Sequence, residues 1–560
     1  MKNKANIFLV FIALLPFLSQ AQNNTFSPYS RYGLGELSQP TFAHNTGMGG
    51  AHIALKPDST MPIFINVGNP ASYALIRLTT LEVGGSFLHS TFKGNNNTSL
   101  TKWGTSFAYG ALGFPVRKNG GAAFGLMPFS SVGYETNTTI NQENIGAVQY
   151  KYYGNGGLNK AFIGYGILPF KNKLANFRSK YSYLPDSMRT LTRAQYVRRQ
   201  LVNKLVSDLS LGFNVNYIFG NVSNSTRIVY PNSLTYNNTY RDRVLTVGDF
   251  TGNFGAQTGV TIDSTLDHKG RKARIAAELK VLSDQNMYSK AKLKFMEDSI
   301  ASVTRFDTTL DKKGKKAKIA SEIKILSDQN IYSEAQLKMK RDSLAAVTPL
   351  YRRAYKQKPK FTFGYFMNLN NGLKSDYVTG VYNYVLNGSG QEILRDTVLY
   401  PVSKAGTIRL PLEQGFGIGF KKGERLNMVA DFAITDWTTF KYLNDQNDFK
   451  KSYRVSVGAN FVPEKYAAGR GSFGRKVNYR IGASYQTGYL SIEDNLISDY
   501  SVSLGIGLPV GINRISSMVN VSAQYGFMGS SDPSILKQNY WRVNFGFTFC
   551  DRWFQKYRED

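Results

Sequence analysis

The chain has 560 residues, a formal net charge of +30 and a single cysteine, Cys550. One cysteine excludes an intrachain disulfide and a multi-cysteine metal site. The positive charge by itself fits nucleic acid or anionic lipid as a partner.

The N-terminus has the pattern of a secretory signal. Lys2 and Lys4 precede an apolar run over residues 7–18, and Ser19-Gln20-Ala21 supplies the small residues that a signal peptidase recognises. We expect residues 1–21 to be this signal peptide, because the run is too short for a transmembrane helix. An exported chain does not normally meet nucleic acid, so we expect no nucleic-acid partner. No later apolar run is long, so any membrane span must consist of strands.

Apolar and polar residues alternate most strictly near the C-terminus. The alternating stretches are 453–461, 477–486, 500–508, 519–525 and 541–549. Strict alternation predicts strands with one apolar face. A soluble β-sandwich has the same pattern. The long β-hairpins, the aromatic residues at strand ends and the export signal favour a membrane barrel, in which every backbone polar group is paired.

Nine further strands are expected upstream. They cover 81–92, 102–116, 122–138, 148–170, 209–230, 244–262, 361–384, 407–420 and 426–439. The total is roughly 14, an even number as bacterial barrels require. The predicted fold is an all-β membrane protein, an antiparallel transmembrane β-barrel with strands 1–6 in residues 78–262 and strands 7–14 in residues 359–549.

Residues 22–77 show little alternation but contain two short motifs, Gly47-Met48-Gly49-Gly50-Ala51 and Asn69-Pro70-Ala71. Their order resembles the N-terminal region of the FadL family of outer-membrane transporters for hydrophobic compounds. A second resemblance covers Leu410-Pro411, the glycines of 415–419, and then Asp431 with Asp436-Trp437. The resemblance implies that residues 22–77 form a plug, or hatch, inside the barrel. Asn69 and Pro70 also fit a helix cap and first turn, and the two interpretations are compatible.

Two connections are unusually long, 171–208 and 263–358. With the N-terminus in the periplasm, both follow even-numbered strands and are expected to be periplasmic insertions. The second is an internal duplication, because 263–267 recurs as 307–311. Each copy is expected to form two short amphipathic helices, with turns at 284–286 and 328–330. This helical insertion is either a docking surface for a periplasmic or cell-wall partner or an independently folded unit with a solvated basic face.

No residue pattern indicates an enzyme. His44, His52, His89 and His268 lack the spacing of a metal-binding helix, and no nucleophile elbow is matched to a histidine. The glycines at 415–419 have no following helix and fit the inner face of a strand. We therefore expect no catalytic site, no metal and no cofactor. The tail, residues 550–560, suggests no function, and we expect the lone Cys550 to be buried.

Candidate moving parts come from chain breaks and from the family resemblance. Pro128 interrupts the third strand, and proline removes a ladder donor. In FadL-like barrels a kink in this strand lets an apolar ligand leave sideways into lipid, so the resemblance assigns Met127, Pro128 and Phe129 to a lateral gate. A bulge near a strand end is the alternative. Asn69, Pro70 and Ala71 are the hatch candidates.

Gly154, Gly156 and Gly157 are a second break, expected to mark either the start of a strand or a bulge that lets the plug approach the wall.

The resemblance implies a channel in the outer membrane of a Gram-negative bacterium, surrounded by lipid, for passive uptake of a hydrophobic small molecule such as a long-chain fatty acid. The alternative is a non-transporting FadL-like barrel, similar to the PorV type, that anchors a secretion or assembly machine through the repeat at 263–358. A continuous apolar cavity reaching Pro128 favours the channel. A filled lumen and an exposed apolar face on the repeat favour the partner role.

Overall fold

The computed structural model divides the chain into two compact units, residues 1–260 with 360–560, and residues 261–359. The described residues are 25–57, 64–94, 99–117, 119–143, 145–170, 202, 205–231, 236–261, 266–306, 312–356, 359–369, 371–387, 391–442, 445–446, 449–464, 473–492, 494–510, 517–530 and 532–551. The expected signal peptide, most of the 171–208 insertion and the tail beyond residue 551 lie outside them. No helix in the described part of the chain is long and apolar enough to cross a membrane.

The first unit is a closed barrel. Its wall strands are β2 (Thr79–Lys93), β3 (Ser99–Arg117), β4 (Gly120–Gln142), β5 (Gly146–Ile167), β6 (Ser210–Val229), β7 (Asn238–Thr261), β8 (Pro359–Asn368), β9 (Gly372–Leu386), β10 (Glu392–Arg409), β11 (Leu412–Lys422), β12 (Leu426–Asp436), β15 (Ser452–Phe461), β16 (Asn478–Gln486), β19 (Ser498–Val510), β20 (Ser517–Gly529) and β21 (Lys537–Asp551). β8 and β9 are successive segments of one wall position, and β10 and β11 of the next. The described strands therefore make 14 positions, as predicted.

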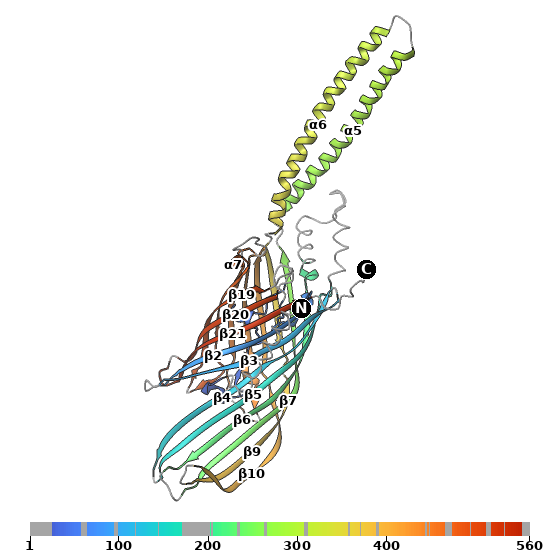
Figure 1. Cartoon of the computed structure of the whole chain (residues 1–560). Helices are drawn as coiled ribbons and strands as arrows, with labels where there is room; N and C mark the ends of the chain where they lie inside the picture. The colour runs from blue at the N-terminus through green and yellow to red at the C-terminus, as the bar shows by residue number, and fades with distance from the viewer. Residues whose placement is uncertain are drawn as a thin grey trace, which may run out of the picture. The chain divides into compact units, whose positions relative to one another are not determined.

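Antiparallel pairing runs around the whole ring. Each wall position pairs with the next, and β21 pairs with β2 from Thr79↔Asp551 to Lys93↔Lys537. This last ladder closes the barrel (Figure 1). β10 begins well before the expected start at residue 407. The sequence pattern missed this first part because both of its faces are exposed, so apolar and polar residues do not alternate there.

The two faces of the wall have opposite character. Outward residues such as Val457, Leu504 and Phe545 are exposed, whereas inward residues such as Ser456 and Ser503 are buried. A water-soluble sandwich would bury its apolar face instead, so the apolar exterior is typical of a barrel in lipid. Cys550, on β21, is buried as expected.

Glycines on the inner wall allow a folded segment to fit inside the ring. We call this segment the plug (described residues 25–57 and 64–77). It contacts strands on every side, for example through hydrogen bonds to Gly133 of β4, Asp431 of β12, Ser503 of β19 and Gln538 of β21. A segment that touches opposite walls must lie within the barrel, which confirms the plug in the predicted fold.

The plug carries short elements of its own, and others lie at the barrel ends. The bounds of these elements are η2 (Pro28–Arg31), β1 (Glu36–Leu37), α2 (Ala43–Thr46), η3 (Pro70–Leu75), η5 (Trp437–Thr439), β13 (Lys441–Tyr442), β14 (Asp445–Gln446), α7 (Phe473–Lys476), β17 (Ser491–Ile492) and β18 (Asn495–Leu496).

The second unit is a helical hairpin of α5 (Leu266–Phe306) and α6 (Lys312–Lys356), one helix for each copy of the duplication. The expected turns at 284–286 and 328–330 are wrong, because both stretches lie within continuous helix. Asp-Gln-Asn has turn-like composition, but no glycine or proline interrupts the helix there. Asn286 and Asn330 instead lie buried in the seam between the helices, and Asn286 Nδ2 donates to Ser333 Oγ at 2.8 Å.

Candidate functional site

One ladder of the barrel wall, the one between β3 and β4, is paired along only part of its length. β3 pairs with β2 along nearly its whole length, from Lys93↔Ser99 to Thr80↔Gly113. Its pairing with β4 runs only from Gly110↔Leu126 to Arg117↔Gly120. We call the place where this ladder ends the lateral seam. In Figure 1 the β2–β3 and β4–β5 strand pairs diverge from one another at their far ends.

Pro128 and Phe129 lie on β4 immediately after the lateral seam begins. Pro128 pairs with Asn159 of β5 and Ser130 with Leu158, so Phe129 is an extra residue in a bulge. This bulge is in the middle of β4 rather than near its end. Met127 is buried in the apolar cluster that also includes Ala123 and Phe162. The three gate candidates therefore coincide with the loss of pairing to β3.

The plug, rather than β3, covers the edge of β4 at this point. Glu36 and Leu37 of β1 pair antiparallel with Ser131 and Ser130, and the backbone amide of Ser38 donates to the carbonyl of Phe129 at 2.9 Å. The β4 edge is thus closed by this chain's own N-terminal segment just beyond the bulge.

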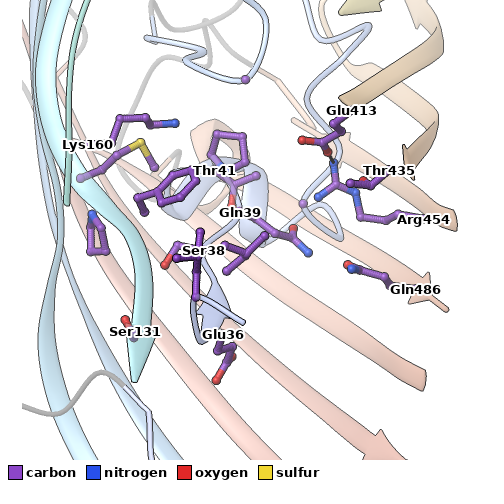
Figure 2. A pocket seen from close by; sticks show the side chains of 18 of the residues that line it. Glu36, Ser38, Gln39, Thr41, Ser131, Lys160, Glu413, Thr435, Arg454 and Gln486 are labelled. Atoms are coloured by element: carbon purple, nitrogen blue, oxygen red, sulfur yellow. Dashed lines mark hydrogen bonds and ion pairs between the residues drawn. The ribbon is translucent and has the colours of Figure 1, made fainter. Parts of the chain in front are cut away.

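A cavity of about 360 Å³ lies beside the lateral seam. Phe107 of β3 and Met127 with Phe129 of β4 line it, so both sides of the interrupted ladder contribute. Plug residues 36–41 line it as well. Figure 2 shows the polar part of the lining, in which Ser38, Gln39 and Thr41 lie between Lys160 on one side and Glu413 with Arg454 on the other.

Several charged groups face this cavity and are held by partners. Arg454 Nη2 lies 3.5 Å from Glu413 Oε1, and Asn368 Nδ2 donates to the other Glu413 oxygen at 2.7 Å. Arg542 Nη2 lies 3.2 Å from Glu36 Oε1. The cavity is apolar toward the lateral seam and charged elsewhere. It therefore differs from the continuous apolar cavity that we expect in a channel for hydrocarbons.

Asn69, Pro70 and Ala71, the hatch candidates, are buried deep in the plug. Asn69 caps η3, because its side-chain oxygen accepts from the amide of Ala71 at 3.2 Å. Its Nδ2 also donates to the carbonyl of Ile53 at 2.8 Å. A Cβ at Gly212 of β6 would lie 2.3 Å from the Pro70 carbonyl carbon. These contacts hold the three residues against the wall in this structure.

Gly154, Gly156 and Gly157 lie within β5, which pairs with β6 in unbroken register through them. The expected approach of the plug is not seen at Gly156 or Gly157. A Cβ there would meet the carbonyl oxygens of Asn221 and Ser130, at 2.3 and 2.4 Å, on the neighbouring strands. The glycines serve close packing of strands opposite the β4 bulge.

The helical hairpin has exposed apolar side chains in addition to those buried between α5 and α6. Val281, Tyr288 and Phe295 recur every seven residues, which places them on one side of α5. Their exposed fractions are 56%, 74% and 72%. Ile325 and Met339, the duplicated counterparts of Val281 and Phe295, are likewise exposed on α6. We call these five residues the apolar stripe.

Sequence reasoning missed the charged lining of the cavity and the plug contact of the β4 edge. Lys160, Glu413 and Arg454 come from strands far apart in the chain, so no local spacing indicates that they meet. Asp431 was noticed only as part of a family pattern. In the structure its carboxylate accepts from the backbone amides of His52 at 2.6 Å and Ile53 at 2.7 Å.

A family model describes most of the chain. The BamG model matches residues 3–197 and 342–560, and these stretches include both ends of the barrel and the whole plug. The chain belongs to the BamG family. The unmatched residues, 198–341, contain all of α5 and most of α6, so most of the helical hairpin lies outside the part shared with this family.

Several solved structures are similar to this BamG-family chain at low sequence identity. The Ralstonia pickettii toluene transporter TbuX has 11% identity and a TM-score of 0.43, with 91% of this chain and 98% of that chain covered. A Pseudomonas aeruginosa FadL homologue has 10% identity and a TM-score of 0.43, with 92% of this chain and 99% of that chain covered. The P. putida toluene transporter TodX has 10% identity and a TM-score of 0.43, with 92% of this chain and 100% of that chain covered. No curated protein matches the sequence.

Proposed function

We propose that this protein is a non-enzymatic subunit of the machinery that assembles β-barrels in the outer membrane of a Gram-negative bacterium. The observation that carries the proposal is the BamG-family match across the plug and both ends of the barrel. The family name points to the β-barrel assembly (BAM) machinery as partner. The exposed apolar exterior of the wall fits an outer-membrane location.

The barrel, rather than the helical hairpin, is the better candidate for the contact with this machinery. Most of the hairpin lies outside the family match, so a role common to the family would use the barrel. The hairpin's apolar stripe supports a second contact, with a periplasmic or cell-wall partner. The five exposed large apolar side chains of this stripe are typical of an interaction surface.

Co-purification tests this function. The tagged full chain and a variant lacking residues 266–356 would be extracted from outer membranes in mild detergent and their partners identified by mass spectrometry. We expect the central barrel of the assembly machinery with both proteins, and a hairpin partner only with the full chain. Absence of assembly components from both samples contradicts the proposal. A tagged, unrelated barrel of similar abundance is the control for non-specific capture.

Passive uptake of hydrophobic compounds is the second candidate function. The cavity beside the lateral seam favours it, because Phe107, Met127 and Phe129 place an apolar lining where the wall is unpaired. Deleting Phe129 removes the extra residue of the bulge and should lower cellular uptake of a radiolabelled long-chain fatty acid. Uptake equal to that of the unaltered chain, at equal barrel abundance, argues against a channel at the lateral seam.

A further inference from the structure

The lateral seam leaves one edge of β3 without a strand partner. Residues 99–109 pair with β2 on one side, and the ladder with β4 begins only at Gly110. No other pairing of these residues occurs in the described part of the chain. Backbone donors and acceptors on this edge therefore have no strand to bond with.

Part of this edge lies at the depth of the membrane. Trp103 is 68% exposed on the outer face and stacks with Phe87 of β2. His89 pairs with both Trp103 and Trp541, and Trp541 is exposed beside Tyr525. Exposed aromatic residues of this kind mark the boundary between lipid and water. Because Trp103 is close to the β2–β3 hairpin end of the ladder, we expect the β3 residues between Trp103 and Gly110 to lie on the hydrocarbon side of that boundary.

An open strand edge in hydrocarbon is unfavourable, because each unpaired backbone group there lacks a hydrogen-bond partner. In this chain the two sides of the lateral seam differ. Next to the bulge, the β4 edge is bonded to the plug through Phe129, Ser130 and Ser131, and only the later part of β4 lacks a strand on this side. The β3 edge has no such cover among the described residues at any point from 99 to 109, so an added strand that starts where the β3–β4 ladder ends would find its free hydrogen bonds on β3.

We propose that the edge of β3 at residues 99–109 is a docking site for a β-strand of another outer-membrane barrel protein, which joins it by β-augmentation. This inference rests on the proposed assembly function, since that function brings unpaired strands of other barrels into the membrane. The incoming strand is extended, lacks proline in its paired part and presents apolar side chains to lipid at every second residue. Trp103 marks the lipid-facing side of the site, and Phe107 is partly exposed on the same face of the strand while it also lines the cavity at the open edge.

Site-specific photocrosslinking tests this site. A photoreactive phenylalanine analogue would replace Phe107 or Trp103, and Phe545 would be the matched control. Phe545 is also an exposed aromatic residue, but its strand is paired on both sides, with Gly85 and Val521. We expect roughly tenfold more adducts with other proteins at Phe107 and Trp103 than at Phe545, because an open edge accepts a strand and a closed one does not. The crosslinked peptide should map to a transmembrane strand of its protein.

Other outcomes overturn the inference. Equal adducts at all three positions, adducts with lipid alone, or a crosslink to residues 22–24 of the same chain each exclude a partner strand on β3. Co-purification of assembly components is measured on the same three samples. If these components are present without the Phe107 crosslink, the docking site is wrong and the assembly function stands. If they are absent, the assembly function itself is wrong.

Discussion

Asp431 on β12 accepts a hydrogen bond from the backbone amide of Ile53 at 2.7 Å, and this contact ties the plug to the wall. The same carboxylate accepts from His52 at 2.6 Å and from Ala54 at 3.4 Å. One buried acidic group thus satisfies three successive amides of a segment that has no regular secondary structure there. Backbone amides of such a segment need side-chain partners when they are buried.

Replacing Asp431 with asparagine should loosen the plug. Asparagine keeps the size but removes the charge, and a hydrogen bond to a charged group contributes about 1.5–3 kcal/mol. We expect a lower midpoint of thermal unfolding in detergent and faster proteolysis between residues 50 and 57. Asp396→Asn, on the exposed part of β10, is the control and should change neither. An unchanged Asp431→Asn barrel would show that other contacts hold the plug.

Adding a side chain at Gly482 of β16 should displace the plug. A Cβ there would lie 2.1 Å from the Gly49 nitrogen and 2.2 Å from the Met48 carbonyl carbon, and Gly49 itself has a φ of +68° that favours glycine. We expect Gly482→Val to raise single-channel conductance in planar bilayers or to prevent heat-modifiable folding on gels. Gly474→Ala, whose nearest neighbour would be 3.9 Å away, should behave like the unaltered chain.

Replacing Asn286 with leucine should stabilise the helical hairpin. Asn286 is a buried polar residue between the two helices, and burying an apolar side chain there gains about 1 kcal/mol or more. We expect a higher midpoint for loss of the helical circular dichroism signal at 222 nm in the full chain. The same change at Gln329, which is exposed, should leave this midpoint in place. A lower midpoint for Asn286→Leu would mean that its bond to Ser333 outweighs the apolar gain.

Polar substitutions in the apolar stripe should separate partner binding from stability. Tyr288→Ser combined with Phe295→Ser removes two exposed rings, and surface changes usually alter stability by no more than about 0.5 kcal/mol. We expect an unchanged helical melting curve but loss of the hairpin partner in co-purification. Lys280→Ser, also exposed on α5, serves as control. Partner capture that survives the double substitution would exclude the apolar stripe as the contact.

Local sequence patterns were sufficient for the wall of the barrel. Alternation predicted outward residues such as Val457 and Leu504, and both are exposed. The pattern is reliable because side chains in a strand point to opposite faces in turn, whatever the strand pairs with. Alternation failed at the first part of β10, where both faces are exposed. The turn prediction failed at Asn286, where a triplet with turn-like composition lies inside a long helix.

The sequence by itself determined the number of strands, which face of each meets lipid, and that the duplicated residues form a helical unit, whereas the plug was implied by the resemblance to a known family. These features depend on periodicity and composition within short stretches. Only the tertiary structure decided where the β3–β4 ladder ends, that plug residues bond to β4 there, and that Lys160, Glu413 and Arg454 share one cavity. Strand register and contacts between distant strands depend on closing the whole ring, and no short stretch of sequence contains that information.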